Sequence, residues 1–279
     1  MSEFDIAIPG ARCRVWPDGP LWGGTIAGAI GKLHFDDAAS GEAVLRLACE
    51  RLFSGGRKAV LAPMDGDTWH SYRAVTESDG SPGFALEPVS GPHDVAALRA
   101  AGFEGVSEYV SARAPVPLVA SDSPKVPGVQ VQGWDGQGAE ALLDRLFELA
   151  GGAFADKLFF KPIERDDFLA LYRPLLAMID PRLVLFAFDG SGEMAGFLFG
   201  LPDVAQGSAP DTAILKTYAS RKPGVGHLLA HSFHERAREL GYAHVVHALM
   251  HVDNVSRERS ARHAGSVFRR YGLFGRRAE

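Results

Sequence analysis

The 279-residue chain has little of what marks a secreted, membrane or nucleic-acid-binding protein. Its two cysteines, Cys13 and Cys49, are too few and too far apart to predict a disulfide framework or a metal site. No apolar run approaches the ~18 residues of a membrane helix, and the N-terminus MSEFDIAIPG lacks a signal-peptide pattern. A net charge of −5 argues against broad electrostatic binding to nucleic acid. We therefore expect a cytoplasmic protein with no metal, nucleic-acid or membrane partner.

The composition is that of an ordinary globular protein, with 46% hydrophobic and 23% charged residues. At this length there is room for two domains of typical size. Residues 112–128 carry four prolines and no amphipathic period, which predicts a linker. We therefore expect one domain over residues 1–111 and a second over residues 129–279.

The most informative segment, residues 213–254, has the pattern of strand, turn, helix and strand. AILKTYAS (213–220) is rich in strand formers, and RKPGVG (221–226) is a turn with two glycines and two cations. Apolar residues then recur at three- and four-residue spacing over 227–240, and HVVHALM (244–250) is the next strand. Because glycines let backbone N–H groups approach a ligand and a helix N-terminus carries partial positive charge, the turn predicts a phosphate or pyrophosphate site.

Two other phosphate-binding motifs fail on spacing. A dinucleotide fingerprint needs a third glycine where the chain has Leu229. A Walker-type loop needs serine or threonine after its Gly-Lys pair, where the chain has Leu33. A basic Gly-Pro turn with no ligand remains the simple alternative.

The turn matches a third motif. Arg221, Gly224 and Gly226 form R-x-x-G-x-G between a strand and a helix, which is similar to the acyl-CoA pyrophosphate loop of the GNAT N-acetyltransferase superfamily. Asn254, followed eleven positions later by Gly265, resembles the same family's asparagine, helix and glycine. The whole chain resembles bacterial tandem-GNAT proteins, through segments such as APMDGDTWHSYR, ILKTYAS and RRYGLF. The resemblance implies an α/β (α+β) tandem GNAT fold: a mixed central sheet flanked by helices, with acetyl-CoA as co-substrate.

An internal repeat supports the tandem arrangement. An offset of 185 places Gly41 on Gly226, and the apolar positions of residues 44–52 on those of residues 229–237. On this alignment Asp36 and Asp37 replace the two cations of the second turn, and Ala39 replaces its first glycine. Since carboxylates repel a pyrophosphate, we expect the N-terminal copy to be reduced and not to bind the cofactor.

The second domain follows the order expected of the fold. A strand (129–134) precedes an amphipathic helix (139–150), a second helical stretch (165–178) and a hairpin that turns at residues 190–192.

The resemblance also assigns cofactor-binding roles. The pyrophosphate site would comprise Arg221, Lys222, Gly224, Val225, Gly226 and His227. The thioester and pantetheine arm would lie along Thr217, Tyr218 and Ala219, with Asn254 and Ser256 as side-chain partners of the arm. Asn254 could equally be a helix N-cap.

The catalytic residues are harder to assign. The tyrosine that usually protonates the leaving thiolate would stand seven residues after Asn254, where the chain has Ala261. Ser260 and Tyr271 are the alternative acids, although Tyr271 could be only a core residue. His251, near the end of its strand, is the candidate base because a histidine titrates near neutral pH; it could instead be structural.

A histidine stripe on the predicted helix invites a metal-site interpretation. His227, His231 and His234 lie within ~60° of one another on the helix. Their stripe falls largely opposite the apolar face, and no cysteine or acidic ligand accompanies it. We expect these histidines to face solvent and to bind no metal.

The sequence therefore favours an acetyl-CoA-dependent N-acetyltransferase that acts on a primary amine of a small-molecule or amino-acid-like substrate. A non-catalytic acyl-CoA-binding regulator, or an interaction protein that retains the fold, is the alternative. A homodimer is possible. The first domain would contribute Trp69, His70, Tyr72 and Arg73 to the substrate groove, or these residues would only anchor the packing of the two domains.

Overall fold

The computed structural model describes residues 2–116, 124–253, 260 and 263–278. The first half of the chain forms strands around two helices. The elements are β1 (Phe4–Ile8), β2 (Ala11–Trp16), β5 (Gly28–Phe35), α1 (Ala38–Ser54), β6 (Ala59–Ala62), β7 (Ala74–Ser78), α2 (Asp94–Ala100) and β8 (Glu104–Pro115). A separate small hairpin consists of β3 (Leu21–Trp22) and β4 (Thr25–Ile26).

The second half has the element order that the sequence predicts. It comprises β9 (Gln130–Gly133), α3 (Ala139–Phe154), α4 (Arg165–Tyr172), β10 (Val184–Phe188), β11 (Met194–Pro202), β12 (Thr212–Ser220), α5 (Val225–Glu239), β13 (His244–His251) and β14 (Ser266–Arg277). Three 3-10 helices connect them, namely η1 (Arg173–Met178), η2 (Pro181–Leu183) and η3 (Val204–Gln206). The predicted helix at 165–178 is therefore α4 continued by η1.

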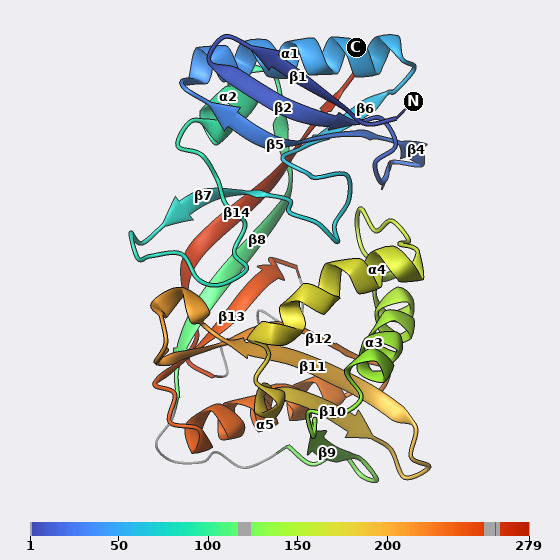
Figure 1. Cartoon of the computed structure of the whole chain (residues 1–279), viewed down its shortest axis with the longest axis vertical. Coiled ribbons are helices and arrows are strands. Elements are labelled where there is room, and N and C mark those ends of the chain that lie inside the picture. The colour runs from blue at the N-terminus through green and yellow to red at the C-terminus, as the bar shows by residue number, and fades with distance from the viewer. Residues whose placement is uncertain (1, 117–123, 254–259, 261–262, 279) are drawn as a thin grey trace.

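One mixed sheet of twelve strands passes through both halves (Figure 1). Its order is β1-β2-β5-β6-β14-β8-β13-β12-β11-β10-β9, with β7 paired to β14 outside this path. The strand pair β5 and β6 is parallel, as is the pair β12 and β13, and antiparallel pairing holds elsewhere in the sheet. This confirms the predicted mixed sheet flanked by helices.

The internal repeat of the sequence is also present in the structure. Each parallel pair is joined by a helix, α1 in the first half and α5 in the second. Val44 and Ala48 of α1 are fully buried, and so are Leu229 and Phe233, their counterparts on α5. The same face of each helix therefore packs on its sheet, as the sequence offset predicts.

The two halves exchange their long strands. β8 comes from the first half of the sequence but pairs with β13, while β14 comes from the C-terminus but pairs with β6, where Phe274 lies opposite Ala62. β8 and β14 also pair with each other, and they run diagonally between the halves in Figure 1. The predicted linker at 112–128 is therefore wrong at its start. Residues 112–115 belong to β8, which ends at Pro115, because proline has no N–H to continue a ladder.

Helices cover both faces of the sheet in the second half. Alternate residues of β11 separate the two cores: Phe197 and Phe199 pack with α3 and α4, whereas Leu198 packs with α5. In the first half, Cys13 and Cys49 are free and buried, and burial raises the pKa of each thiol to about 12. No helix in the described residues is both long and apolar enough to span a membrane.

The strand exchange makes a prediction about stability. Phe274 of β14 is 3% exposed and lies in the core of the first half, beside residues such as Leu45 and Leu98. Phe274→Ala should lower the free energy of unfolding by about 3–5 kcal/mol, through lost burial and the cavity left behind. Denaturant unfolding followed by circular dichroism measures this loss.

Val267→Ala is the matched control, because Val267 lies on the same strand and is 39% exposed. It should change the free energy of unfolding by less than about 1 kcal/mol. Equal losses in the two variants would contradict the claim that β14 completes the first half's core.

Candidate functional site

The parallel strands β12 and β13 diverge after a short paired region. They pair from Thr212 opposite His244 to Leu215 opposite His247, and no pairing between them is present beyond that point in the described residues. A register shift against β11 leaves Lys216 as an extra residue in β12, which is a β-bulge. β13 is also irregular, and Leu249 adopts a φ of +58°. The two strands therefore form a wedge, with one edge of β12 unpaired toward it.

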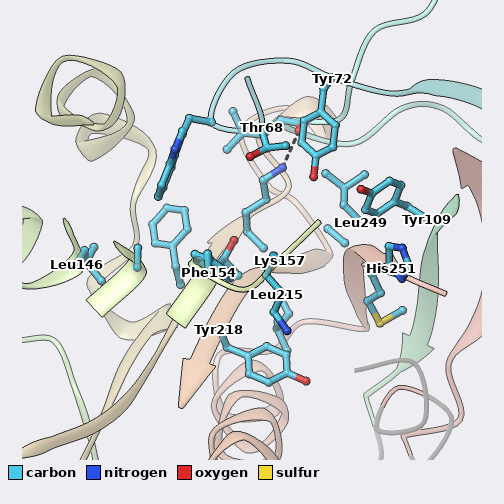
Figure 2. A pocket seen from close by; sticks show the side chains of 18 of the residues that line it. Thr68, Tyr72, Tyr109, Leu146, Phe154, Lys157, Leu215, Tyr218, Leu249 and His251 are labelled. Atoms are coloured by element: carbon cyan, nitrogen blue, oxygen red, sulfur yellow. Dashed lines mark hydrogen bonds between the residues drawn. The ribbon is translucent and has the colours of Figure 1, made fainter. Parts of the chain in front are cut away.

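A cavity of about 1010 Å³ opens from this wedge. Both halves of the chain contribute to its wall, as Figure 2 shows. The first half supplies residues 68–73, 86–88 and Tyr109, while the second supplies residues of α3, α4, β12 and β13. Figure 2 places Tyr72, Tyr109 and His251 on one side of the cavity, and Leu146 and Phe154 of α3 on the other. The packing of the two halves therefore creates the site.

The glycine turn before α5 leaves the helix N-terminus without a side-chain cap. Gly224 occupies the N-cap position with a φ of +82°, a conformation that favours glycine. Arg221 is exposed and forms no ion pair with a described residue. Lys222 forms an ion pair with Asp189, and this hydrogen bond holds the pKa of that carboxyl well below its usual range. The turn thus carries two basic residues, one of them paired with Asp189, and no side chain of the described residues caps the helix.

The equivalent turn in the first half is capped. The Asp37 carboxylate accepts hydrogen bonds from the Ser40 backbone N–H at 2.8 Å and from the Ser40 hydroxyl at 3.0 Å. The backbone bond is the main cause of the lowered pKa of Asp37. A negative charge of the protein itself therefore occupies the place that an anionic ligand would take at α1.

The residues predicted to bind cofactor fall into two groups. Thr217 and Tyr218 line the cavity, whereas Ala219 is 8% exposed and packs in the core below α3. The predicted pyrophosphate residues Arg221, Lys222, Gly224, Val225, Gly226 and His227 form the turn and the first residues of α5. Asn254 and Ser256 lie outside the described residues.

The candidate acids differ in placement. Ser260 lines the cavity and is 3% exposed, and its hydroxyl has no hydrogen-bond partner among the described residues. Tyr271 is fully buried and does not line the cavity. Its hydroxyl donates to Glu87 at 2.5 Å, and burial raises its pKa further above the usual value. The placement of Tyr271 suits a core residue that holds Glu87 better than a proton donor to a ligand.

His251, the candidate base, also lines the cavity. Its ring packs edge-on against Tyr109, with 5.2 Å between the centroids. Its Nδ1 accepts a hydrogen bond from the Asp253 backbone N–H at 3.1 Å. In a neutral imidazole this leaves the proton on Nε2, so neither nitrogen offers a free lone pair in this arrangement. To act as a base, His251 would have to release the Asp253 amide.

A buried arginine and a partly buried lysine in the wedge escaped the sequence analysis as a pair. Lys216 stands at the bulge, and its Nζ donates to the Leu86 carbonyl oxygen of the first half at 2.9 Å. Burial, together with the nearby Arg73 guanidinium, lowers the pKa of Lys216 to about 7. Arg73 is 6% exposed and stacks between Tyr72 and Tyr109. The lysine was visible in the predicted strand, but its contact with the first half depends on long-range packing.

The histidines of α5 contradict the prediction that they face solvent. His231 and His234 are 5% and 3% exposed. His234 hydrogen bonds through Nε2 to Nε2 of His247 at 2.8 Å, and its ring stacks on His263 with 4.0 Å between the centroids. The helix is therefore buried on two faces, one against the apolar core and one against β13 and His263. Among the described residues, no group of three or more histidine, cysteine, aspartate or glutamate side chains is arranged to hold a metal ion.

The buried histidines predict an acid-sensitive fold. Burial, the main cause in each case, lowers the pKa of His234 to about 2 and of His247 to about 3. Between these values and the unfolded pKa of ~6.5, the unfolded chain binds more protons, so stability is lost as the pH falls below ~6.5. His234→Gln/His247→Gln should reduce the slope of the free energy of unfolding between pH 6 and 5 by roughly 2 kcal/mol per pH unit.

Urea unfolding at several pH values tests this expectation. His34→Gln serves as the control, since His34 is an exposed residue of β5 in the first half. The control should keep the wild-type slope. A double variant with that same slope would show that these imidazoles do not stay neutral in the folded protein.

Comparison with known proteins identifies the fold. No protein-family model matches the chain, and no curated protein matches its sequence. A GCN5-related N-acetyltransferase from Sphaerobacter thermophilus matches in structure with a TM-score of 0.59 and 12% identity, over 96% of this chain and 76% of that one. A tandem GNAT protein from the clavulanic acid biosynthesis pathway matches with a TM-score of 0.57 and 14% identity, over 100% and 84%.

A third solved structure agrees with these two. A probable N-acyltransferase from Enterococcus faecalis V583 matches with a TM-score of 0.58 and 11% identity, over 99% of this chain and 62% of that one. At such identities the likeness concerns the fold. It spans nearly all of this chain in all three comparisons, including both parallel β-α-β units. The chain therefore has the fold of the GCN5-related N-acetyltransferases, in its tandem form.

Proposed function

We propose that the protein is an acyl-CoA-dependent N-acetyltransferase whose cofactor site lies in the second half. The observation that carries this proposal is the contrast between the two helix N-termini. In α5 the turn is basic, rich in glycine and without a side-chain cap, whereas in α1 the Asp37 carboxylate caps the helix. A tandem fold that keeps one open anion site beside a wedge suits one acyl-CoA per chain.

The proposed substrate positions follow from the geometry of the wedge. The pyrophosphate of acetyl-CoA would bind at residues 221–227, with Arg221 as the cation that has no ion-pair partner among the described residues. The pantetheine arm would lie against the unpaired edge of β12. There, Thr217 and its neighbours could offer backbone N–H groups to the ligand. The same edge supplies donors for the thioester oxygen as charge develops on it.

The acceptor would enter from the cavity between the halves. Its primary amine attacks the thioester carbonyl carbon, the bond between carbon and sulfur breaks, and the thiolate leaves. The amine must lose one proton and the thiolate must gain one. Ser260 and His251 line the cavity and remain our candidates for these transfers, directly or through water. The acceptor would be a small-molecule amine, because residues of both halves line the cavity and limit its volume to about 1010 Å³.

Three observations favour a second function. The usual tyrosine position is Ala261, the Tyr271 hydroxyl is bonded to Glu87, and the His251 Nδ1 already accepts a hydrogen bond. The missing tyrosine and the two existing hydrogen bonds suit a regulator that binds acyl-CoA without turnover. Release of free thiol from acetyl-CoA in the presence of any amine, above the rate of hydrolysis, would eliminate the regulator.

Calorimetric titration with acetyl-CoA tests the cofactor site. The wild-type chain should show one site, and Arg221→Glu/Gly224→Val should weaken binding at least tenfold. The arginine substitution removes a cation and adds an anion, while valine at a φ of +82° distorts the turn. Arg221→Glu alone tests the charge without altering the backbone conformation.

Arg236→Glu is the charge-matched control, because Arg236 lies in the last turn of the same helix. It should bind acetyl-CoA as the wild-type chain does. Two sites per chain would contradict the proposal that the Asp37 carboxylate prevents acyl-CoA from binding at α1 of the first half. No binding by the wild-type chain would refute the proposed function.

A further inference from the structure

Two basic side chains, the buried Arg73 and the partly buried Lys216, line the cavity. Lys216 reaches from the β12 bulge to the Leu86 carbonyl oxygen, and Arg73 enters from the first half. The two cations are close enough that the guanidinium contributes to the lowered pKa of the lysine. Both residues line the cavity that an acceptor would fill. With a pKa of about 7, Lys216 is only partly protonated near neutral pH, and a carboxylate bound beside it would favour its charged form.

The carboxylate beside these cations is already neutralised. Glu87 accepts from Arg269 Nη1 at 2.7 Å and from the Tyr271 hydroxyl at 2.5 Å, and the ion pair with Arg269 is almost fully buried. Asp156 and Asp253, the other carboxylates of the cavity wall, are exposed. Among the described residues, no carboxylate lies within ion-pair distance of Arg73 or Lys216.

The hydrogen-bonding capacity of Arg73 is also largely unused. Its guanidinium carries five N–H donors, and Nη1 donates to the Leu249 carbonyl oxygen at 3.2 Å. Nε is buried and has no hydrogen-bond partner among the described residues. The ring contacts fix the plane of the group, since its central carbon lies 3.8 Å from the centroid of Tyr72 and 3.9 Å from that of Tyr109. A rigid, buried guanidinium with free donors is an anion-binding group.

Part of the wall on the side of the second half is apolar. Leu142 and Leu146 of α3 and Phe168 of α4 line it, and all three are buried. A ligand that pairs with the two basic side chains and also packs against α3 and α4 needs an anionic group at one end and an apolar body. Because Lys216 stands at the bulge, the anionic group would sit close to the point where the acceptor amine attacks.

We propose that the acceptor is an apolar amino acid or a close analogue, whose carboxylate binds Arg73 and Lys216. This inference rests on the proposed acetyltransferase function and names the substrate class of the same site. It assigns a specific task to the first half, which binds no cofactor but supplies Arg73. The carboxylate would compensate the buried charge, and the side chain would pack against α3 and α4.

Matched pairs of acceptors test the proposal. The probes are phenylalanine, phenylalaninamide and 2-phenylethylamine, together with leucine and 3-methylbutylamine, each with acetyl-CoA and detection of the released thiol. In the wild-type enzyme kcat/KM should be at least tenfold higher for each amino acid than for its analogues that lack the carboxylate. Arg73→Gln and Lys216→Met should each reduce this ratio toward one, while calorimetric binding of acetyl-CoA is retained.

The ratio within one variant does not depend on how much of the protein is folded, and thermal melting checks folding separately. Arg113→Gln is the matched control for Arg73→Gln. Arg113 also places its guanidinium over an aromatic ring, 4.4 Å from the centroid of Phe268, but it does not line the cavity. The control should keep the wild-type preference for amino acids.

Several outcomes would overturn the assignment. Equal rates for acceptors with and without a carboxylate would show that the cations do not recognise an acceptor carboxylate. No acetylation of any probe by protein that binds acetyl-CoA would overturn the assignment together with the proposed turnover, and would favour the regulator. An unchanged ratio in both pocket variants would exclude Arg73 and Lys216. A tenfold preference for succinyl-CoA over acetyl-CoA would assign the anion to the acyl donor. Failure to bind acetyl-CoA at all would instead refute the proposed function.

Discussion

The pairing between β8 and β14 is the constraint on which the rest of the molecule depends. Each strand leaves its own half of the sequence and enters the sheet of the other half. Neither half can therefore complete its sheet alone, and the two cannot separate without breaking ladder hydrogen bonds. This rigid connection holds the loop with Arg73 against Leu249 of β13. A cavity whose wall comes from two repeats thus keeps a fixed shape.

The two repeats differ at the N-terminus of the helix that joins their parallel strands. Both contain a helix between parallel strands, with the same face buried. In the first, the Asp37 side chain caps and stabilises α1. In the second, Gly224 provides no such cap at the N-terminus of α5. The first repeat is then free to contribute side chains to the acceptor side of the other.

Local sequence pattern predicted much of this fold. The features that it did not predict depend on contacts between residues far apart in the chain. The periodicity of α3 and α5, the turn before α5 and the repeat of Val44 and Leu229 are properties of short segments, so the sequence was sufficient for them. Residues 112–115 form a strand because they pair with β13, which lies far away in the chain. The burial of His234 likewise depends on His247 and His263, and no helical pattern contains that information.

The charges of the wedge constrain the chemistry that it can support. Arg73 and Lys216 both repel an ammonium group, so an acceptor that carries an amine alone would enter a site of unfavourable potential. An acceptor that also carries a carboxylate brings compensating charge to these cations. The same cationic surroundings disfavour the protonated amine and hence favour the nucleophilic form. Recognition of the carboxylate and activation of the amine would then have one electrostatic origin, which lessens the need for a dedicated strong base in the wall.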